Sequence, residues 1–160
     1  RKIRMRKNVS ITIMLVLFMI YIKTSETVYA DTICTYESEV SYEYFSDGSY
    51  FETKIIYNSN RSTIKGASKT TTYKNSVGTA LWYVTVTGNF TYNGSSSSCT
   101  ASSASAGSYS NAWKILNKSA SKSGSSATAI ATAGQYIGNV AIGSYNKSVT
   151  LRCDANGNLS

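Results

Sequence analysis

The chain has 160 residues and a formal net charge of +8, with no histidine, no proline and three cysteines. The absence of histidine excludes Ser-His-Asp and Cys-His catalysis and histidine-ligated metal sites. Most of the positive charge lies in the first 30 residues. Residues 31–160 carry ten basic and seven acidic residues, hence a net charge of +3, and this balance predicts no nucleic-acid partner.

Residues 1–30 have the pattern of a secretory signal. A basic head is followed by an uncharged apolar stretch, residues 9–22, and a polar tail that ends at Val28-Tyr29-Ala30, a small-residue processing signal. The apolar stretch is shorter than the roughly 20 residues that a membrane-spanning helix needs. We therefore predict a signal-peptide helix, a translation start at Met5 and cleavage between Ala30 and Asp31. The processed protein would be secreted, without a stable membrane span.

The first predicted strands form a hairpin with an unusual charge distribution. Residues 39–45 and 49–57 alternate in polarity and flank Asp47-Gly48, a hairpin turn signature. All charges within residues 31–52 are acidic, whereas residues 53–153 contain only basic ones. The acidic hairpin is expected to pair loosely with the basic body, or its charges are simply solvated. The alternative is a basic surface for anionic wall polymers or membrane headgroups.

The clearest strand pattern lies in residues 80–94. Residues of one parity are mainly large and apolar: Trp82, Val84, Val86, Gly88, Phe90 and Tyr92. The other parity places Tyr83, Thr85 and Thr87 on an outward face, because side chains alternate across a strand. Gly88 is expected to mark a bulge or a bend between two shorter strands, and Asn93-Gly94 to supply a turn.

Further strand-like runs follow at short intervals. They are residues 69–74, 112–116, 125–134, 135–143 and 147–153. The alanine-rich face of residues 125–134 would suit close approach of two sheets. Two serine-rich stretches, residues 94–111 and 119–126, are compatible with flexible linkers or with exposed strands.

These runs predict an all-β protein, an antiparallel β-sandwich that is Ig-like or a small barrel. The predicted single secreted domain covers residues 31–160. It comprises the acidic hairpin, residues 31–57, and a main body, residues 67–160.

The three cysteines allow three pairings. An exported chain can keep a disulfide, and we favour Cys99–Cys153, because both residues sit where a strand-like run meets a turn-like run. Cys34 would then be free, or would pair with a second copy or a partner.

No catalytic or metal-binding pattern exceeds chance. Ser-x-x-Lys occurs three times in a chain rich in both residues, without the companion motifs of penicillin-recognising enzymes. Glu39 and Glu43 would be too far apart for a glycosidase pair, and Glu37 with Glu39 lacks a feature that raises one pKa. Residues 154–158 resemble an Asn-Gly turn more than a calcium loop. We expect no enzymatic activity, no metal and no cofactor.

The outward aromatic and hydroxyl residues are the remaining candidates for function. Tyr83, with Thr85 and Thr87 beside it, would stack on sugar rings or pack against a partner. The alternative is that tyrosine is enriched in strands for packing reasons alone. Trp82 and Trp113 are assigned to the core.

Three stretches together resemble a known group of proteins: residues 73–99, residues 117–133 and residues 148–160. They are similar to small exported proteins of Gram-positive, Clostridia-like bacteria whose function is unknown. The resemblance covers about residues 67–160 and includes both Cys99 and Cys153. It implies secretion, agrees with the Cys99–Cys153 pairing, and brings no catalytic residues.

The sequence therefore predicts a secreted, non-catalytic binding module. Its expected partner is a cell-wall polymer, a polysaccharide or a protein, and non-covalent contacts would hold it at the cell surface if it stays there. The runner-up is a secreted bacteriocin-like or envelope-targeting effector. A hydrolase is disfavoured.

Overall fold

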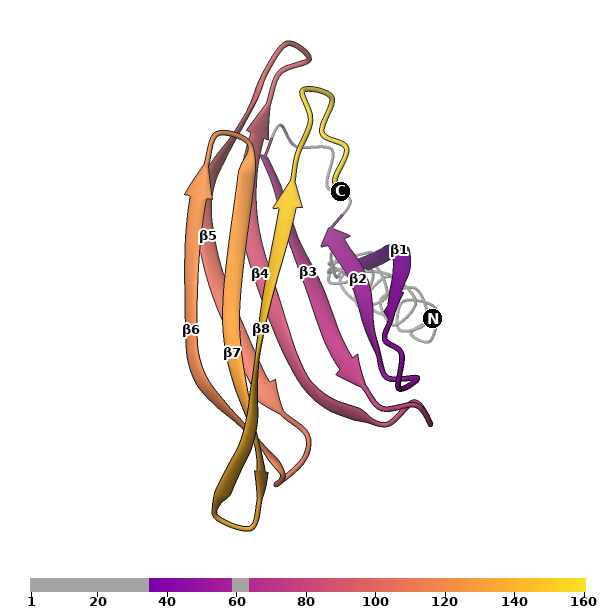
Figure 1. Ribbon diagram of the computed structural model, residues 1–160. Coiled ribbons are helices and arrows are strands. Elements are labelled where there is room, and N and C mark those ends of the chain that lie inside the picture. Colours follow the sequence, from indigo (N-terminus) through magenta and orange to yellow (C-terminus); the bar gives the residue numbers. More distant parts are fainter. Residues whose placement is uncertain (1–34, 59–63) are drawn as a thin grey trace, which may run out of the picture. The chain divides into compact units, whose positions relative to one another are not determined.

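A computed structural model of the chain describes residues 35–58 and 64–160 (Figure 1). The predicted signal helix, the start at Met5, the Ala30–Asp31 cleavage site and Cys34 lie outside the described residues. Within the described part, no helix is long and apolar enough to cross a membrane.

The described chain folds into eight antiparallel strands in two sheets, which confirms the predicted all-β sandwich. The strands are β1 (Thr35–Tyr44), β2 (Tyr50–Asn58), β3 (Ile64–Lys74), β4 (Ala80–Tyr92), β5 (Ser97–Ser108), β6 (Trp113–Ser123), β7 (Ser126–Ile137) and β8 (Val140–Arg152). Strands β1 to β5 form one sheet and β6 to β8 the other, each in sequence order. The sandwich is therefore a meander, without the Greek-key connections of Ig domains.

The core lies between the two sheets and follows the alternation of β4. Trp82, Val84, Val86 and Phe90 are buried, whereas the intervening residues of β4 are half-buried or exposed. Trp82 packs edge-on against Phe51 of β2, with ring centroids 5.9 Å apart. Since apolar burial is the main stabilising term in folding, this one-sided burial fixes which face of the five-stranded sheet points inward.

The three-stranded sheet supplies the other half of the core with small side chains. Ala127, Ala129, Ala131 and Ala133 of β7 are all essentially inaccessible to solvent, and β7 lies against β4 and β5. The prediction that this alanine face permits close approach of the sheets is confirmed.

Gly88 has a different role from the predicted one. Strand β4 runs unbroken through Gly88, and the register shift against β5 lies one residue later, between Asn89 and Phe90. A Cβ atom at Gly88 would lie 2.7 Å from Phe90 Cε2 and 2.9 Å from Ala127 Cβ. The glycine therefore makes room for the opposite sheet.

The serine-rich stretches are strands. They contain all of β5 and the end of β6. Strand β5 is hydrogen-bonded to β6 and to the turn after it: Ser102 Oγ donates to Ser121 O at 2.9 Å, and Cys99 N–H to Gly124 O at 2.7 Å. Residues 135–143, predicted as one strand, instead contain the turn between β7 and β8. The predicted turns at Asp47-Gly48, Asn93-Gly94 and Asn156-Gly157 are confirmed, and each glycine has a positive φ.

The acidic hairpin contacts the basic body through its inward face. Glu43 of β1 pairs with Lys147 of β8 at 2.5 Å, and the same ammonium lies 4.1 Å from the centre of the Phe51 ring. Partial burial lowers the pKa of Lys69, an effect that the negative charge of Glu39 opposes. The pairing of hairpin and body that the charge pattern predicted is present.

Candidate binding face

The outer face of the five-stranded sheet carries the three predicted binding residues. Tyr83 and Thr85 are half-buried and Thr87 is exposed, and all three lie opposite the buried parity of β4. Among the described residues no second layer covers this face, because the β6–β8 sheet packs on the other one. The residues of β4 are therefore brought together on a surface open to solvent.

Hydrogen bonds between neighbouring strands hold the hydroxyl groups of this face. Thr85 Oγ1 lies 2.7 Å from Thr70 Oγ1, and Thr87 Oγ1 lies 2.8 Å from Ser68 Oγ on the same strand, β3. Such cross-strand pairs stabilise a sheet and restrict the rotation of both side chains. The hydroxyl groups thus form a fixed row along β3 and β4.

A tyrosine cluster on the acidic hairpin shares the outer face, although these tyrosines were not among the predicted binding residues. Tyr44 and Tyr50 have ring centroids 5.1 Å apart, and Tyr42 lies 6.0 Å from Tyr50. Tyr42 and Tyr44 are 52% and 68% exposed. Their alternation with Glu43 was a usable signal, since it put the tyrosines and the acids on opposite faces.

A second tyrosine pair lies on the other side of the face. Tyr83 packs on Tyr109, which follows β5, with ring centroids 5.3 Å apart. A Cβ atom at Gly107 would lie 2.8 Å from the Tyr83 ring, so this glycine lets the ring lie over β5. Tyr50 and Tyr83 stand on strands β2 and β4, which at about 4.8 Å per strand are roughly 10 Å apart.

Charged groups lie between the two tyrosine clusters. Lys74 Nζ donates to Glu52 Oε2 at 2.9 Å, and it lies 6.0 Å from the centre of the Tyr50 ring. Lys54 Nζ is 3.7 Å from the other Glu52 oxygen. We call the set of residues on this surface the tyrosine–threonine face: Tyr42, Tyr44, Tyr50, Glu52, Lys74, Ser68, Thr70, Tyr83, Thr85, Thr87 and Tyr109.

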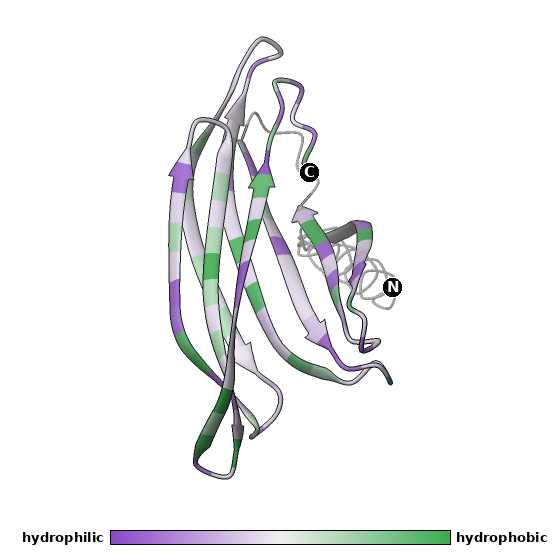
Figure 2. Ribbon diagram, in the orientation of Figure 1, coloured by the Kyte–Doolittle hydropathy of each residue, from purple (hydrophilic) through white to green (hydrophobic). Residues whose placement is uncertain are grey.

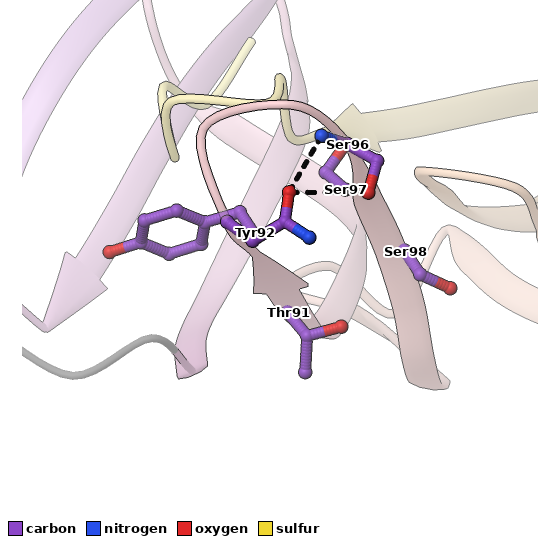
Figure 3. A pocket seen from close by; sticks show the side chains of 6 residues that line it. Thr91, Tyr92, Ser96, Ser97 and Ser98 are labelled. Atoms are coloured by element: carbon purple, nitrogen blue, oxygen red, sulfur yellow. Dashed lines mark hydrogen bonds between the residues drawn. The ribbon is translucent and has the colours of Figure 1, made fainter.

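Three small hollows lined by described residues lie away from this face or at its margin. One, of about 110 Å³, lies at the β4–β5 turn between Tyr92 and Ser98; there Asn93 Oδ1 accepts the Ser96 N–H at 2.8 Å (Figure 3). Another, of about 310 Å³, lies beside the C-terminus and includes Arg152 and Asp154. Both volumes fall near or below the lower end for small-molecule sites.

In the Ser-x-x-Lys sequences and in residues 154–158, which were considered for catalysis and for calcium binding, the polar groups form local structural contacts. Lys122 Nζ donates to Thr100 O at 2.6 Å and Lys147 pairs with Glu43, so both ammonium groups are engaged away from the serines of their Ser-x-x-Lys sequences. Hydrogen bonds from Asn158 lower the pKa of Asp154, as does the Asn156 N–H. No group of three or more metal-ligating side chains occurs among residues 35–58 and 64–160.

The predicted Cys99–Cys153 disulfide is absent, and both residues are buried free thiols. Cys99 Sγ donates to Ala101 O at 3.2 Å, and Cys153 Sγ to Asp154 O at 3.5 Å. Each thiol is thus directed to a carbonyl of its own segment, although the two strand ends both hydrogen-bond to the β6–β7 turn.

The two thiols should react slowly with thiol reagents in the folded protein. Burial raises the pKa of both Cys99 and Cys153, which lowers the thiolate fraction at neutral pH, and the thiolate is the reactive form. In a Cys34→Ser variant, we expect iodoacetamide to label neither residue until denaturant is added, as read by mass spectrometry. Rapid labelling of either cysteine under native conditions would contradict their burial.

Comparison of the chain with protein-family models, curated proteins and solved structures finds no match.

Proposed function

We propose that this protein is a secreted, non-catalytic binding module whose tyrosine–threonine face binds a cell-wall polysaccharide. The observation that carries the proposal is the presence of two exposed tyrosine clusters, around Tyr50 and around Tyr83, on one uncovered sheet face. Secretion is the expectation set by residues 1–30. A surface of this kind does not need a deep pocket.

The tyrosines suit a sugar polymer because their rings offer apolar faces and their hydroxyls offer hydrogen bonds. A pyranose ring likewise has an apolar C–H face and a rim of hydroxyls. The roughly 10 Å between β2 and β4 leaves room for successive sugar units to reach both clusters. Aliphatic side chains are scarce on this face, with Val40 and Ile56 at 39% and 40% exposed, which disfavours an apolar protein partner.

The polar residues between the clusters suit the rim of such a ligand. Glu52 and Lys74 are held by their ion pair, and Thr70 and Thr85 by their hydrogen bond. Groups that are already ordered lose less conformational entropy when a ligand binds. The face is therefore pre-organised for hydrogen bonding to hydroxyl groups along an extended chain.

Substitution of the tyrosines tests the proposal. We expect the full-length protein to bind insoluble cell-wall polysaccharide in a sedimentation assay. Tyr50→Ala and Tyr83→Ala should each weaken binding by roughly fivefold, since an aromatic contact contributes about 1 kcal/mol and 1.4 kcal/mol is tenfold in affinity. Raised salt should weaken binding only if the polymer is anionic, because screening acts on charge pairs.

Ser148→Leu is the matched control, because Ser148 is exposed on the outer face of the other sheet, opposite Ile130 in register. It should leave binding unchanged. Equal binding by the parent and a Tyr50→Ala/Tyr83→Ala double variant, with circular dichroism showing both folded, would rule out this face as the site. Release of soluble sugars during the assay would instead indicate a hydrolase.

The second candidate is an envelope-targeting effector. It is favoured by exposed apolar side chains at the β7–β8 turn, namely Ile137, Val140 and Ile142. Killing or permeabilisation of related bacteria by the pure protein, without binding to wall polysaccharide, would replace the first proposal by this one.

A further inference from the structure

The two ends of the sandwich differ in polarity. At one end lie the turns around residues 45–49, 75–79, 109–112 and 138–139, and there Phe45, Val77 and Tyr109 are exposed. At the other end, the described turns consist of serine, asparagine, glycine, aspartate and alanine, and no large exposed hydrophobic residue lies in them. We call the first the apolar end.

The β7–β8 hairpin carries the most concentrated part of this apolar surface. Ile137, Val140 and Ile142 are 70%, 66% and 50% exposed, and they surround a turn made by Gly138, with φ of 60°, and Asn139. Figure 2 shows green segments at this hairpin tip, at the lower end of the view. Three neighbouring exposed aliphatic residues at a tip form one apolar patch, the kind of surface that differs from singly scattered hydrophobic residues.

Aromatic and basic side chains lie just above the tip. Lys114 of β6 lies with its Nζ 4.7 Å from the centre of the Tyr136 ring. Lys114 pairs in register with Gly134, three residues before Ile137, which corresponds to about 10 Å along the strand. Tyrosine and lysine at this distance from an aliphatic tip match the order found at a membrane surface, where amphipathic rings and cations lie at the headgroup level.

The three-stranded sheet carries only basic charged residues, and Lys114 is the one nearest the tip along the strands. Residues 113–152 contain Lys114, Lys118, Lys122, Lys147 and Arg152 and no acidic residue. Glu43 neutralises Lys147. The other four basic residues of this set leave the sheet with a net positive charge. Lys122 and Arg152 lie near the opposite ends of β6 and β8, about 30 Å or more from the tip. Within this sheet Lys114 is therefore the residue close enough to contribute the roughly 1 kcal/mol that a basic residue adds near an anionic membrane.

We infer that the β7–β8 hairpin tip inserts into the headgroup and acyl boundary of an anionic lipid membrane. The inserted residues are Ile137, Val140 and Ile142, with Tyr136 and Lys114 at the headgroup level. The paired strands satisfy their own backbone hydrogen bonds across the hairpin, with Ile137 opposite Val140, so shallow insertion leaves few polar groups unpaired. This inference is independent of the glycan-binding face, which uses other residues.

A tryptophan placed in the turn reports insertion directly. Asn139→Trp is compatible with the backbone, because Asn139 lacks a positive φ. The change in emission is read against the parent protein, whose Trp82 and Trp113 are buried. Because every variant keeps the full chain, any contribution of residues 1–34 is the same throughout. The probes are vesicles of equimolar phosphatidylglycerol and phosphatidylcholine, and vesicles of phosphatidylcholine alone.

With the anionic vesicles we expect a blue shift of the Asn139→Trp emission and protection from an aqueous quencher. Ser95→Trp, in the β4–β5 turn at the opposite end, should remain exposed. Ile137→Ser/Val140→Ser/Ile142→Ser in the Asn139→Trp background should weaken partitioning roughly a hundredfold. Val40→Ser/Ile56→Ser/Ile130→Ser, which removes as many exposed aliphatic side chains elsewhere, should not weaken it by more than about twofold.

Several outcomes would overturn the inference. They are a solvent-exposed signal from the Asn139→Trp probe on anionic vesicles at low salt, equal burial of the Ser95→Trp probe, or insertion unaffected by the triple substitution at the tip. Burial of the Asn139→Trp probe without vesicles, rising with protein concentration, would mean that the tip binds a second copy of this chain. The melting temperature of each variant is expected to lie near that of the parent, which would exclude unfolding as the cause of any loss of insertion.

Discussion

Replacing Trp82 with alanine should lower the free energy of unfolding by about 3–5 kcal/mol. Trp82 is fully buried, and its ring contacts Phe51, Tyr73 and Trp113 at centroid distances of 5.9, 6.3 and 6.3 Å. It therefore joins β2, β3, β4 and β6 in one aromatic cluster. Since small domains are stable by only about 5–15 kcal/mol, the variant should unfold at a much lower urea concentration, measured by circular dichroism.

Trp82→Phe separates the packing of the ring from its polar atom. Trp82 Nε1 is buried without a hydrogen-bond partner in the structure, and an unpaired buried donor itself costs about 1–3 kcal/mol. Phenylalanine removes this donor while keeping a six-membered aromatic ring. We expect less than half of the destabilisation of Trp82→Ala. Equal losses in the two variants would show that ring packing is not what Trp82 contributes.

The parts of the fold that were predictable share one property, which is one-sided burial of large residues. In β4, Trp82, Val84 and Val86 alternate with hydroxyl residues, so the period of two and the buried face can both be read directly. The tight turn at Asp47-Gly48 was equally readable, because a glycine with positive φ has a local sequence signature.

The strands that the sequence left undecided or misplaced lack that property. Strand β5 presents serine and alanine on alternate positions, and its Ala104 and Ala106 are only half-buried. Its strand conformation comes from pairing along β4. A run of short polar side chains carries no sequence signal for such pairing. The β7–β8 turn is Gly138-Asn139, a pair typical of hairpins, but it was missed because large apolar residues, Ile137 and Val140, flank it directly on both sides. The exposed apolar residues on either side of the turn resemble a continuing buried strand, which masks the short turn signal between them.

Only the part of the candidate face that lies on β4 could be predicted from the sequence. The outward position of Tyr83 follows from the parity of its own strand. The contribution of Tyr42 and Tyr44 required the pairing of Tyr44 with Tyr50 and the order of β1 to β4 in the sheet. Register between strands is a tertiary property, so the hairpin was interpreted through its acids alone.

Enlarging Ala129 to leucine should destabilise the protein by about 3 kcal/mol, at the upper end for overpacked cores. Ala129 is fully buried in the middle of β7, which faces β4 and β5. Its neighbours Ala127 and Ala131 are equally enclosed, so added methyl groups have no free volume to enter. The sheets must move apart, which also loosens contacts around Val84 and Val86. Urea unfolding with circular dichroism measures the loss.

Ser148→Leu supplies the comparison, because it adds a leucine to the adjacent strand on the opposite, exposed face. Its effect should stay within about 0.5 kcal/mol, as for other surface substitutions.

A Gly88→Ala change should act in the same direction as Ala129→Leu, since its Cβ would meet Ala127 Cβ at 2.9 Å. If Ala129→Leu were as stable as the parent, the small side chains of β7 would not be what sets the distance between the sheets. Close sheet packing would then have to come from the aromatic cluster around Trp82 at the other end of the core.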